Sequence, residues 1–124
     1  MQNSLQVFLK LAANEDRFRM LVLLFQEDLC VCHMSGILKL SQPTVSKNLA
    51  KLRDTQFVET EQRGKYVYYS FCSQDQCVTS LLQNVVAHKK DYPQLEKDSK
   101  GLALKDQYLV SCHNNATSCQ KVNT

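Results

Sequence analysis

Cys30 and Cys32 stand two positions apart in the run Asp28-Leu29-Cys30-Val31-Cys32-His33, and their side chains are the ones best suited to chemistry. Thiolates bind soft ions, and an imidazole such as His33 is a usable ligand for zinc or cadmium. The chain has six cysteines, which are Cys30, Cys32, Cys72, Cys77, Cys112 and Cys119. No secretory signal is visible, so the cysteines are expected to stay reduced, which favours metal binding or redox sensing over a set of structural disulfides.

The spacing of the pair has a mechanical consequence. In a regular helix, residues two apart point about 200° away from each other, so a single ion cannot hold both thiolates. The helix expected over Cys30–Leu40 must therefore be unwound at its start when an ion binds. Such binding would distort the helix, which is the differential contact that a two-state switch requires.

A third thiol must come from elsewhere in the chain. Cys77 lies on an apolar stripe and is predicted to be a core residue, and the same interpretation is favoured for Cys72. Cys112 and Cys119 lie in a polar tail where packing does not explain them, so either is a candidate third ligand, with an incidental role as the alternative. For His33, a surface histidine without a role is favoured over a metal ligand.

The segment that follows predicts a DNA-reading helix. Ser41 or Gln42 can cap it, Pro43 fits its first turn, and no Asp or Glu occurs from residue 41 to residue 53. Val45, Leu49 and Leu52 face inward, and an exposed face that is polar, basic and free of acid suits a polyanion. The candidate DNA-binding residues are Ser41, Gln42, Thr44, Ser46, Lys47, Asn48, Lys51, Arg63 and Lys65, and all of those on the helix are expected to point outward.

Two strands over residues 57–62 and 65–71 are predicted next, joined at Arg63-Gly64-Lys65. Gly64 supplies the positive φ that a tight hairpin needs. Arg63 and Lys65 at its tip can reach phosphate groups, which position a protein without reading sequence. A short helix, a turn, a second helix and a basic hairpin together make a winged helix-turn-helix.

The flanking segments predict scaffold helices. One covers residues 3–13, a second runs from its cap at Asn14 to Gln26, and a third is opened by Ser73, with Gln76 as capping-box partner, and runs to about Lys90. The third has two apolar stripes, Cys77/Leu81/Val85 and Val78/Leu82/Val86, so one can face the core and the other a second protomer. The fold class is mainly α with a two-stranded β wing (α-α-α-α-β-β-α), assembled as a homodimer.

Length and composition limit the number of domains and the kinds of partner that the chain can have. A chain of 124 residues fits one globular unit, and its net charge of +3 is compatible with a local basic patch. We divide it into a DNA-binding and dimerisation domain over 1–92 and, over 93–124, a helical segment with a flexible cysteine-containing tail. No signal peptide or membrane span is visible, so the chain is expected to be cytoplasmic.

The motifs Leu29-Cys30-Val31-Cys32, Ser41-Gln42-Pro43-Thr44-Val45-Ser46-Lys47-Asn48-Leu49 and Gly64-Lys65-Tyr66-Val67-Tyr68-Tyr69 resemble those of the ArsR/SmtB family of winged helix-turn-helix metalloregulatory repressors. The likeness covers roughly residues 5 to 90 and is greatest to the arsenic-responsive branch. It implies a homodimer on a palindromic double-stranded DNA operator, released when As(III) or Sb(III) binds cysteine thiolates, in control of arsenic resistance genes.

Three positions depart from the arsenic branch, which usually has Cys-Val-Cys-Asp-Leu-Cys and a histidine in the recognition helix. This chain has His33 for the Asp, Ser35 for the third Cys and Asn48 for the His. Cd(II), Pb(II), Zn(II), methylarsenite and thiol oxidation remain alternative signals. Zinc is disfavoured because His88, Asp91 and Glu96 are unsuitably spaced on the C-terminal helices. An enzyme is disfavoured because neither a Cys-x-x-Cys motif nor a phosphate-cradling cysteine loop is present.

Overall fold

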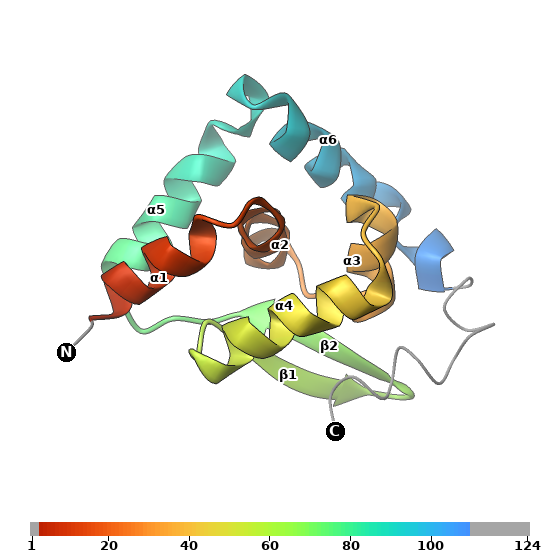
Figure 1. Cartoon of the computed structure of the whole chain (residues 1–124). Helices are drawn as coiled ribbons and strands as arrows, with labels where there is room; N and C mark the ends of the chain where they lie inside the picture. Colours follow the sequence, from red (N-terminus) through yellow and green to blue (C-terminus); the bar gives the residue numbers. More distant parts are fainter. Residues whose placement is uncertain (1–2, 110–124) are drawn as a thin grey trace.

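Six α-helices and one β-hairpin make up the computed structural model, which describes residues 3–109 (Figure 1). The elements are α1 (Ser4–Ala12), α2 (Glu15–Gln26), α3 (Val31–Leu38), α4 (Gln42–Asp54), β1 (Val58–Arg63), β2 (Tyr66–Phe71), α5 (Gln76–Ala87), a 3-10 turn (Lys89–Asp91), α6 (Pro93–Gly101) and a second 3-10 turn (Leu102–Leu104). The predicted mainly helical fold with a two-stranded wing is confirmed. Among the described residues, no helix has the length and apolarity needed to cross a membrane.

Helix α2 is the centre of the core. Its residues Met20, Leu21, Val22, Leu23 and Leu24 are all buried, so the helix is covered on every side. Seen nearly end-on in Figure 1, it is surrounded by the other helices, with the hairpin beneath them. Asn14 caps it as predicted, accepting from the Arg17 N–H at 3.0 Å, and Glu15 and Asp16 lie in its first turn.

Helices α3 and α4 form the predicted helix-turn-helix. Lys39 ends α3 in the left-handed conformation at φ 61°, and the Ser41 hydroxyl then caps α4 by accepting from the Thr44 N–H. Val45, Leu49 and Leu52 are completely buried, as their spacing predicts. Helix α3 packs directly against α4. The first turn of α3 is therefore mechanically connected to the recognition helix.

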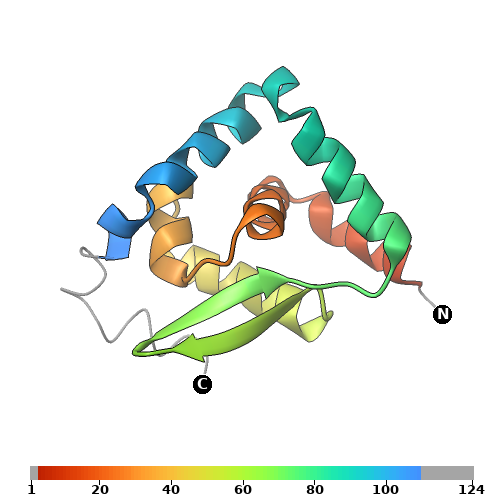
Figure 2. The same cartoon turned by 180° about the vertical axis from the view of Figure 1, so that it is seen from behind.

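The hairpin also forms as predicted, with Val58 opposite Phe71 and Arg63 opposite Tyr66. Gly64 has φ +61°, the conformation that the tight turn requires. In Figure 2 the hairpin lies across α4, and it presents buried Val67 and Tyr69 to the core. Leu29 adds an isolated antiparallel bridge to Tyr69, with N–O distances of 3.0 and 2.7 Å.

Helix α5 differs from the prediction at its start. It begins at Gln76 rather than Ser73, because Asp75 takes the N-cap position and accepts from the Cys77 N–H at 2.9 Å. The Ser4 hydroxyl also donates to Asp75, and this hydrogen bond lowers the pKa of the carboxyl. The capping-box pattern favours Ser73, which has Gln76 three residues on, but the Ser73 hydroxyl instead accepts from the Asp75 N–H at 3.1 Å, one turn before the helix.

The two stripes of α5 have different environments. Val78 and Leu82 are completely buried, whereas Leu81 is 38% exposed and Cys77 is also exposed. The prediction that Cys77 is a core residue is therefore wrong. The helix turns the Val78/Leu82 stripe toward α1 and α2, which leaves the Cys77/Leu81 stripe open.

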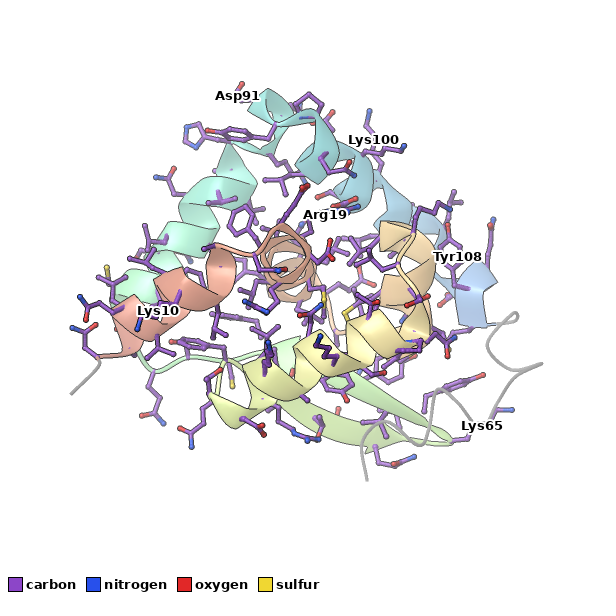
Figure 3. The ribbon with its side chains drawn as sticks, in the orientation of Figure 1. Lys10, Arg19, Lys65, Asp91, Lys100 and Tyr108 are labelled. Carbon is purple, nitrogen blue, oxygen red and sulfur yellow. The ribbon has the colours of Figure 1, made fainter. Side chains whose placement is uncertain are left out.

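Helix α6 packs against α2 and α3 and starts at Pro93. Arg19 donates to both carboxylate oxygens of buried Asp98 at 2.9 Å and to the Leu38 carbonyl at 3.2 Å, so it joins three helices. In Figure 3 its side chain extends from α2 toward α6. The Asp98 hydrogen bond raises the pKa of Arg19. The domain boundary after residue 92 stays a prediction.

We expect Asp98→Ala to lower the free energy of unfolding by about 3 kcal/mol, because it leaves the Arg19 guanidinium without its buried partner. Urea unfolding followed by circular dichroism measures the change. Lys100→Ala is the control: its ion pair with Glu96 spans 3.4 Å at an exposed lysine, and its loss should cost less than about 0.5 kcal/mol. Equal effects of the two variants would contradict the structural role of Asp98.

Candidate DNA interface and thiol site

The outer face of α4 is polar and basic. Ser41, Lys47 and Lys51 are exposed, and Gln42, Thr44 and Ser46 are half-buried. The Ser41 hydroxyl donates to Thr44 Oγ1 at 2.8 Å, which orders the first turn. This face has the shape and charge that suit insertion into a major groove.

Asn48 does not share that face, so the prediction that it points outward is wrong. It is 7% exposed, its Oδ1 accepts from Arg17 Nη1 at 3.2 Å, and its Nδ2 donates to the Thr44 carbonyl at 3.0 Å. Arg17 also donates to the Leu11 carbonyl at 3.0 Å. Asn48 therefore ties α4 to the junction of α1 and α2. Asn48 lies three residues after Val45 and four before Leu52, so the helical period places it on their inward face. That spacing could have predicted its burial.

The wing carries two exposed cations, Arg63 and Lys65, which lie in quite different settings. Arg63 donates to Glu61 and to Asp28, each at 2.6 Å, and its guanidinium carbon lies 4.6 Å from the centre of the Tyr68 ring. The hydrogen bond to Glu61 and then that to Asp28 raise the pKa of Arg63. Lys65 lies at the outer end of the hairpin in Figure 3. A phosphate at Arg63 must compete with two carboxylates.

Cys30 lies just outside α3, as its N-cap, in extended conformation with φ −94° and ψ 173°. It forms a capping box with His33: the His33 ring Nδ1 accepts from the Cys30 N–H at 3.1 Å, and the Cys30 side chain faces the backbone N–H of His33. The regular helix assumed for the two cysteines is therefore wrong at Cys30. The start of the helix is already unwound there, as one ion between Cys30 and Cys32 would require.

His33 is completely buried, so its prediction as a surface residue is wrong. Because Nδ1 accepts from Cys30, a neutral ring carries its proton on Nε2. Nε2 lies 3.6 Å from Asp106 Oδ1 and makes no hydrogen bond within the described residues. The ring also meets Tyr68 edge-on, with centroids 5.7 Å apart. A side chain able to accept a hydrogen bond three residues after an N-cap is the signal that indicates this role.

Cys32 touches the recognition helix. Gln42, the first residue of α4, donates from Nε2 to Cys32 Sγ at 3.9 Å. Cys30 and Cys32 are 0% and 3% exposed, so an ion reaches them only after a local opening. Cys32 is disulfide-bonded, so the expectation that the cysteines stay reduced is wrong at this position. Its sulfur is in direct contact with the DNA-reading helix.

The other cysteines lie apart from this pair or outside the described residues. Cys72 donates to the Gln56 carbonyl at 3.4 Å, and burial raises the pKa of its thiol, which disfavours the thiolate form that binds ions. Cys112 and Cys119 lie outside the described residues. Over residues 3–109, no group of three or more His, Cys, Asp or Glu side chains is placed to hold a metal ion.

A helix-turn-helix followed by a wing with basic side chains defines a winged-helix DNA-binding fold. Residues 14–60 match the family model described as "Bacterial regulatory protein, arsR family". The arsenic resistance transcriptional regulator ArsR1 of Pseudomonas putida is 34% identical over 99 residues, which cover 78% of this chain and 76% of the relative. The chain belongs to the ArsR family, as its motifs indicated, and this family consists of transcription regulators.

Other relatives show the range within the family. The cadmium resistance transcriptional regulatory protein CadC of Listeria innocua is 36% identical over 67 residues, which cover 53% of this chain and 56% of the relative. The solved structure of reduced HlyU from Vibrio cholerae has a TM-score of 0.60 and 33% identity, over 66% of this chain and 84% of that one. The fold is therefore shared between relatives with differently named roles.

We expect Arg63→Ala with Lys65→Ala to weaken binding to every DNA sequence and to lower the slope of log affinity against log salt by about 1.8, at roughly 0.9 per phosphate contact. Fluorescence anisotropy at several salt concentrations measures the slope. Lys10→Ala with Lys100→Ala, which removes two cations far from the hairpin in Figure 3, is the matched control and should leave the slope unchanged.

Gln42→Ala should instead change which operator is preferred, because we place Gln42 at base edges. Competition between operator variants measures that preference. Lost sequence preference with an unchanged salt slope in the Arg63/Lys65 double variant would contradict the placement of these two cations on phosphates.

Proposed function

We propose that this repressor leaves its operator when As(III) or Sb(III) bonds to the thiolates of Cys30 and Cys32, and that it controls arsenic resistance genes. The contact between Cys32 Sγ and Gln42 Nε2 at 3.9 Å carries the proposal, since it joins a candidate ion ligand to the recognition helix once the disulfide of Cys32 has been reduced. Similarity to an arsenic resistance regulator of Pseudomonas putida supports the choice of ion.

The disulfide of Cys32 must first be reduced by an added small thiol, which is itself oxidised to a disulfide. From the reduced protein, the bonding step needs no further change of oxidation state. Each thiol that bonds to arsenous acid replaces one hydroxyl group, and its proton leaves with that hydroxyl as water. The sulfur that bonds to arsenic is then a poorer acceptor for Gln42 Nε2. Bonding at Cys30 also removes its side chain from the capping box with His33. Both changes disturb the first turn of α3 or α4.

The tail cysteines remain our candidates for a third thiolate, Cys112 before Cys119. The chain leading to them starts beside α3: Tyr108 packs so closely on Gly36 that a Cβ atom there would overlap its ring. Lys39 lies 5.6 Å from the centre of the same ring, and Lys105 forms an ion pair with Glu27. Cys112 follows Tyr108 by only four residues in the sequence, which is why we propose it before Cys119.

Cadmium is the second candidate signal. The relative in Listeria innocua is named for cadmium resistance, and a displaced His33 ring would offer Nδ1 as a nitrogen ligand beside the two thiolates. Methylarsenite, with two positions to fill, suits a site of two thiols alone. Titration with arsenite, methylarsenite, antimonite, Cd(II) and Zn(II), while DNA release is followed, separates these signals from one another and from thiol oxidation.

We expect Cys30→Ser and Cys32→Ser to keep operator affinity within about twofold and to abolish release by arsenite. Wild-type protein should lose affinity 5- to 150-fold, about 1–3 kcal/mol, which is the usual range of coupling between two sites. Cys77→Ser, at an exposed cysteine outside the site, is the control and should respond as wild type does. Full release from the Cys32→Ser variant would refute the thiol pair as the sensor.

Cys112→Ser and Cys119→Ser, singly and together, test the third ligand. We expect the arsenite concentration for half-maximal release to rise at least tenfold in Cys112→Ser, because one arsenic–sulfur bond is lost. Release by methylarsenite should change little, since it fills only two positions. A double tail variant with the wild-type arsenite response would show that the tail supplies no ligand.

We further propose a homodimer built on α1 and α5, which lie side by side at one edge in both views (Figures 1 and 2). Leu9 is 51% exposed and Leu81 is 38% exposed, and Val85 is only partly buried. Two recognition helices would then meet half-sites about 10–10.5 base pairs apart. The buried Val78/Leu82 stripe belongs to the protomer's own core, so Leu81 is the informative position.

Leu81→Glu should give a monomer that binds the full operator at least 100-fold more weakly, because the two half-sites no longer act together. Sedimentation velocity and anisotropy measure the two properties. Gln83→Glu adds the same charge at an exposed position on α5 and should leave both unchanged. A monomeric Leu81→Glu variant with wild-type operator affinity would contradict the dimer.

A further inference from the structure

The thiol site is bound to the wing as well as to the recognition helix. Three contacts join them: Asp28 to Arg63, Leu29 to Tyr69, and His33 to Tyr68. We call these six residues the wing joint. Asp28, Leu29 and His33 lie within three positions of Cys30 in the chain, so a movement of Cys30 pulls directly on the joint.

Tyr68 lies at the centre of the joint. Its ring packs against the His33 ring in an edge-to-face arrangement, with centroids 5.7 Å apart and an interplanar angle of 62°. The guanidinium of Arg63 lies over the Tyr68 ring at 4.6 Å from its centre, in cation–π geometry. Burial, followed by the nearness of Cys30, raises the pKa of Tyr68, in keeping with its position beside the thiol.

The hairpin needs this support. A two-stranded hairpin is at best marginally stable by itself, so its position depends on what it packs against. Val67 and Tyr69 anchor one face in the core, and the backbone bonds to Leu29 hold the base of β2. On the other face, Tyr68 leans on His33, which is fully buried and held in the capping box with Cys30.

We propose that Tyr68 is a positioning residue that transmits ion binding from Cys30 to the wing, and that induction withdraws Arg63 from the DNA backbone. This inference rests on the proposed function. A bond from arsenic to Cys30 Sγ removes the side-chain half of the capping box and displaces the Cys30 backbone, which weakens the N–H to Nδ1 hydrogen bond that orients the His33 ring. Tyr68 then loses its ring contact with His33 and shifts, and Arg63 loses its cation–π contact with Tyr68.

Cys30 and, once its disulfide is reduced, Cys32 thus act on different parts of the interface. Cys32 contacts Gln42 at the start of α4, where bases are read, whereas Cys30 connects through His33 and Tyr68 to Arg63 in the wing. These routes differ in one measurable quantity. Losing a base contact leaves the salt dependence of binding unchanged, whereas losing a phosphate contact lowers its slope by about 0.9.

The test is the salt slope of operator binding with and without arsenite, measured on the full chain. We expect arsenite to lower the slope by about 0.9 if Arg63 alone withdraws, and by about 1.8 if Lys65 leaves with it. Weakened binding with an unchanged slope would overturn the wing route and assign induction to the recognition helix alone.

Variants at Tyr68 test the residue itself. Tyr68→Ala should lower the slope by about 0.9 without arsenite, and arsenite should then cause no further decrease. Tyr68→Phe keeps the ring and should behave as wild type. If the alanine variant does not fold, Tyr68→Leu keeps the bulk of the side chain while removing the aromatic face, and the same slopes are expected.

Tyr66→Ala is the matched control. Tyr66 lies on the same face of β2 and has Lys65 over its ring at 5.8 Å, but it is not the ring that meets His33. Its loss should leave the arsenite-induced change of slope in place. Loss of that change in Tyr66→Ala as well would show a general need for wing aromatics and would overturn the specific role of Tyr68.

Calorimetry of arsenite binding to DNA-free protein distinguishes a failure of the proposed function from a failure of the wing route. Tyr68→Ala should bind arsenite with wild-type affinity within about threefold, because no bond to arsenic is removed. If wild type does not bind arsenite, the proposed function fails and the inference falls with it. If it binds arsenite and releases DNA at a constant slope, only the wing route fails.

Discussion

The first turn of α3 is held by a capping box between Cys30 and His33, and Cys30 is also one of the two cysteines that we propose as arsenic ligands. Cys30 and His33 satisfy each other while the helix is intact, through a hydrogen bond of 3.1 Å on one side and the cysteine side chain on the other. N-caps formed by Ser, Thr, Asn or Asp contribute about 1 kcal/mol. That energy is of the size that couples a ligand site to a second site, so competition for Cys30 can itself supply part of a switch.

His33 has a physical role that its departure from the arsenic branch does not reveal. An aspartate at the same position would also accept a hydrogen bond from the residue-30 N–H, so the capping function is compatible with either side chain. The imidazole adds a buried ring that reaches Tyr68 and, at 3.6 Å, Asp106 of the C-terminal segment. Those contacts connect the first turn of α3 to the wing and to residues 105–109.

The rest of the molecule gives these local contacts a rigid support. Helix α2 is buried over five consecutive residues, and Arg19 and Arg17 project from it to Asp98 of α6 and to Asn48 of α4. Because α2 is packed on all sides, it is more firmly held than the start of α4 and the two-stranded wing. In the proposed switch, a disturbance at Cys30 therefore acts mainly on those two elements.

Local chemistry was sufficient to predict most of the framework. The caps at Asn14 and Ser41, the positive φ at Gly64 and the 3.6-residue spacing of Val45, Leu49 and Leu52 act over a few residues, and the sequence determined them by itself. The family motifs pointed to the same winged helix-turn-helix. Tertiary packing decided the remainder: Asn48 turned inward, Cys77 outward, and His33 became fully buried. Arg63 donates to Asp28, which lies 35 positions earlier in the chain. Each of these depends on which distant segment covers a given face, and helical periodicity cannot tell a face that is covered from one that is open.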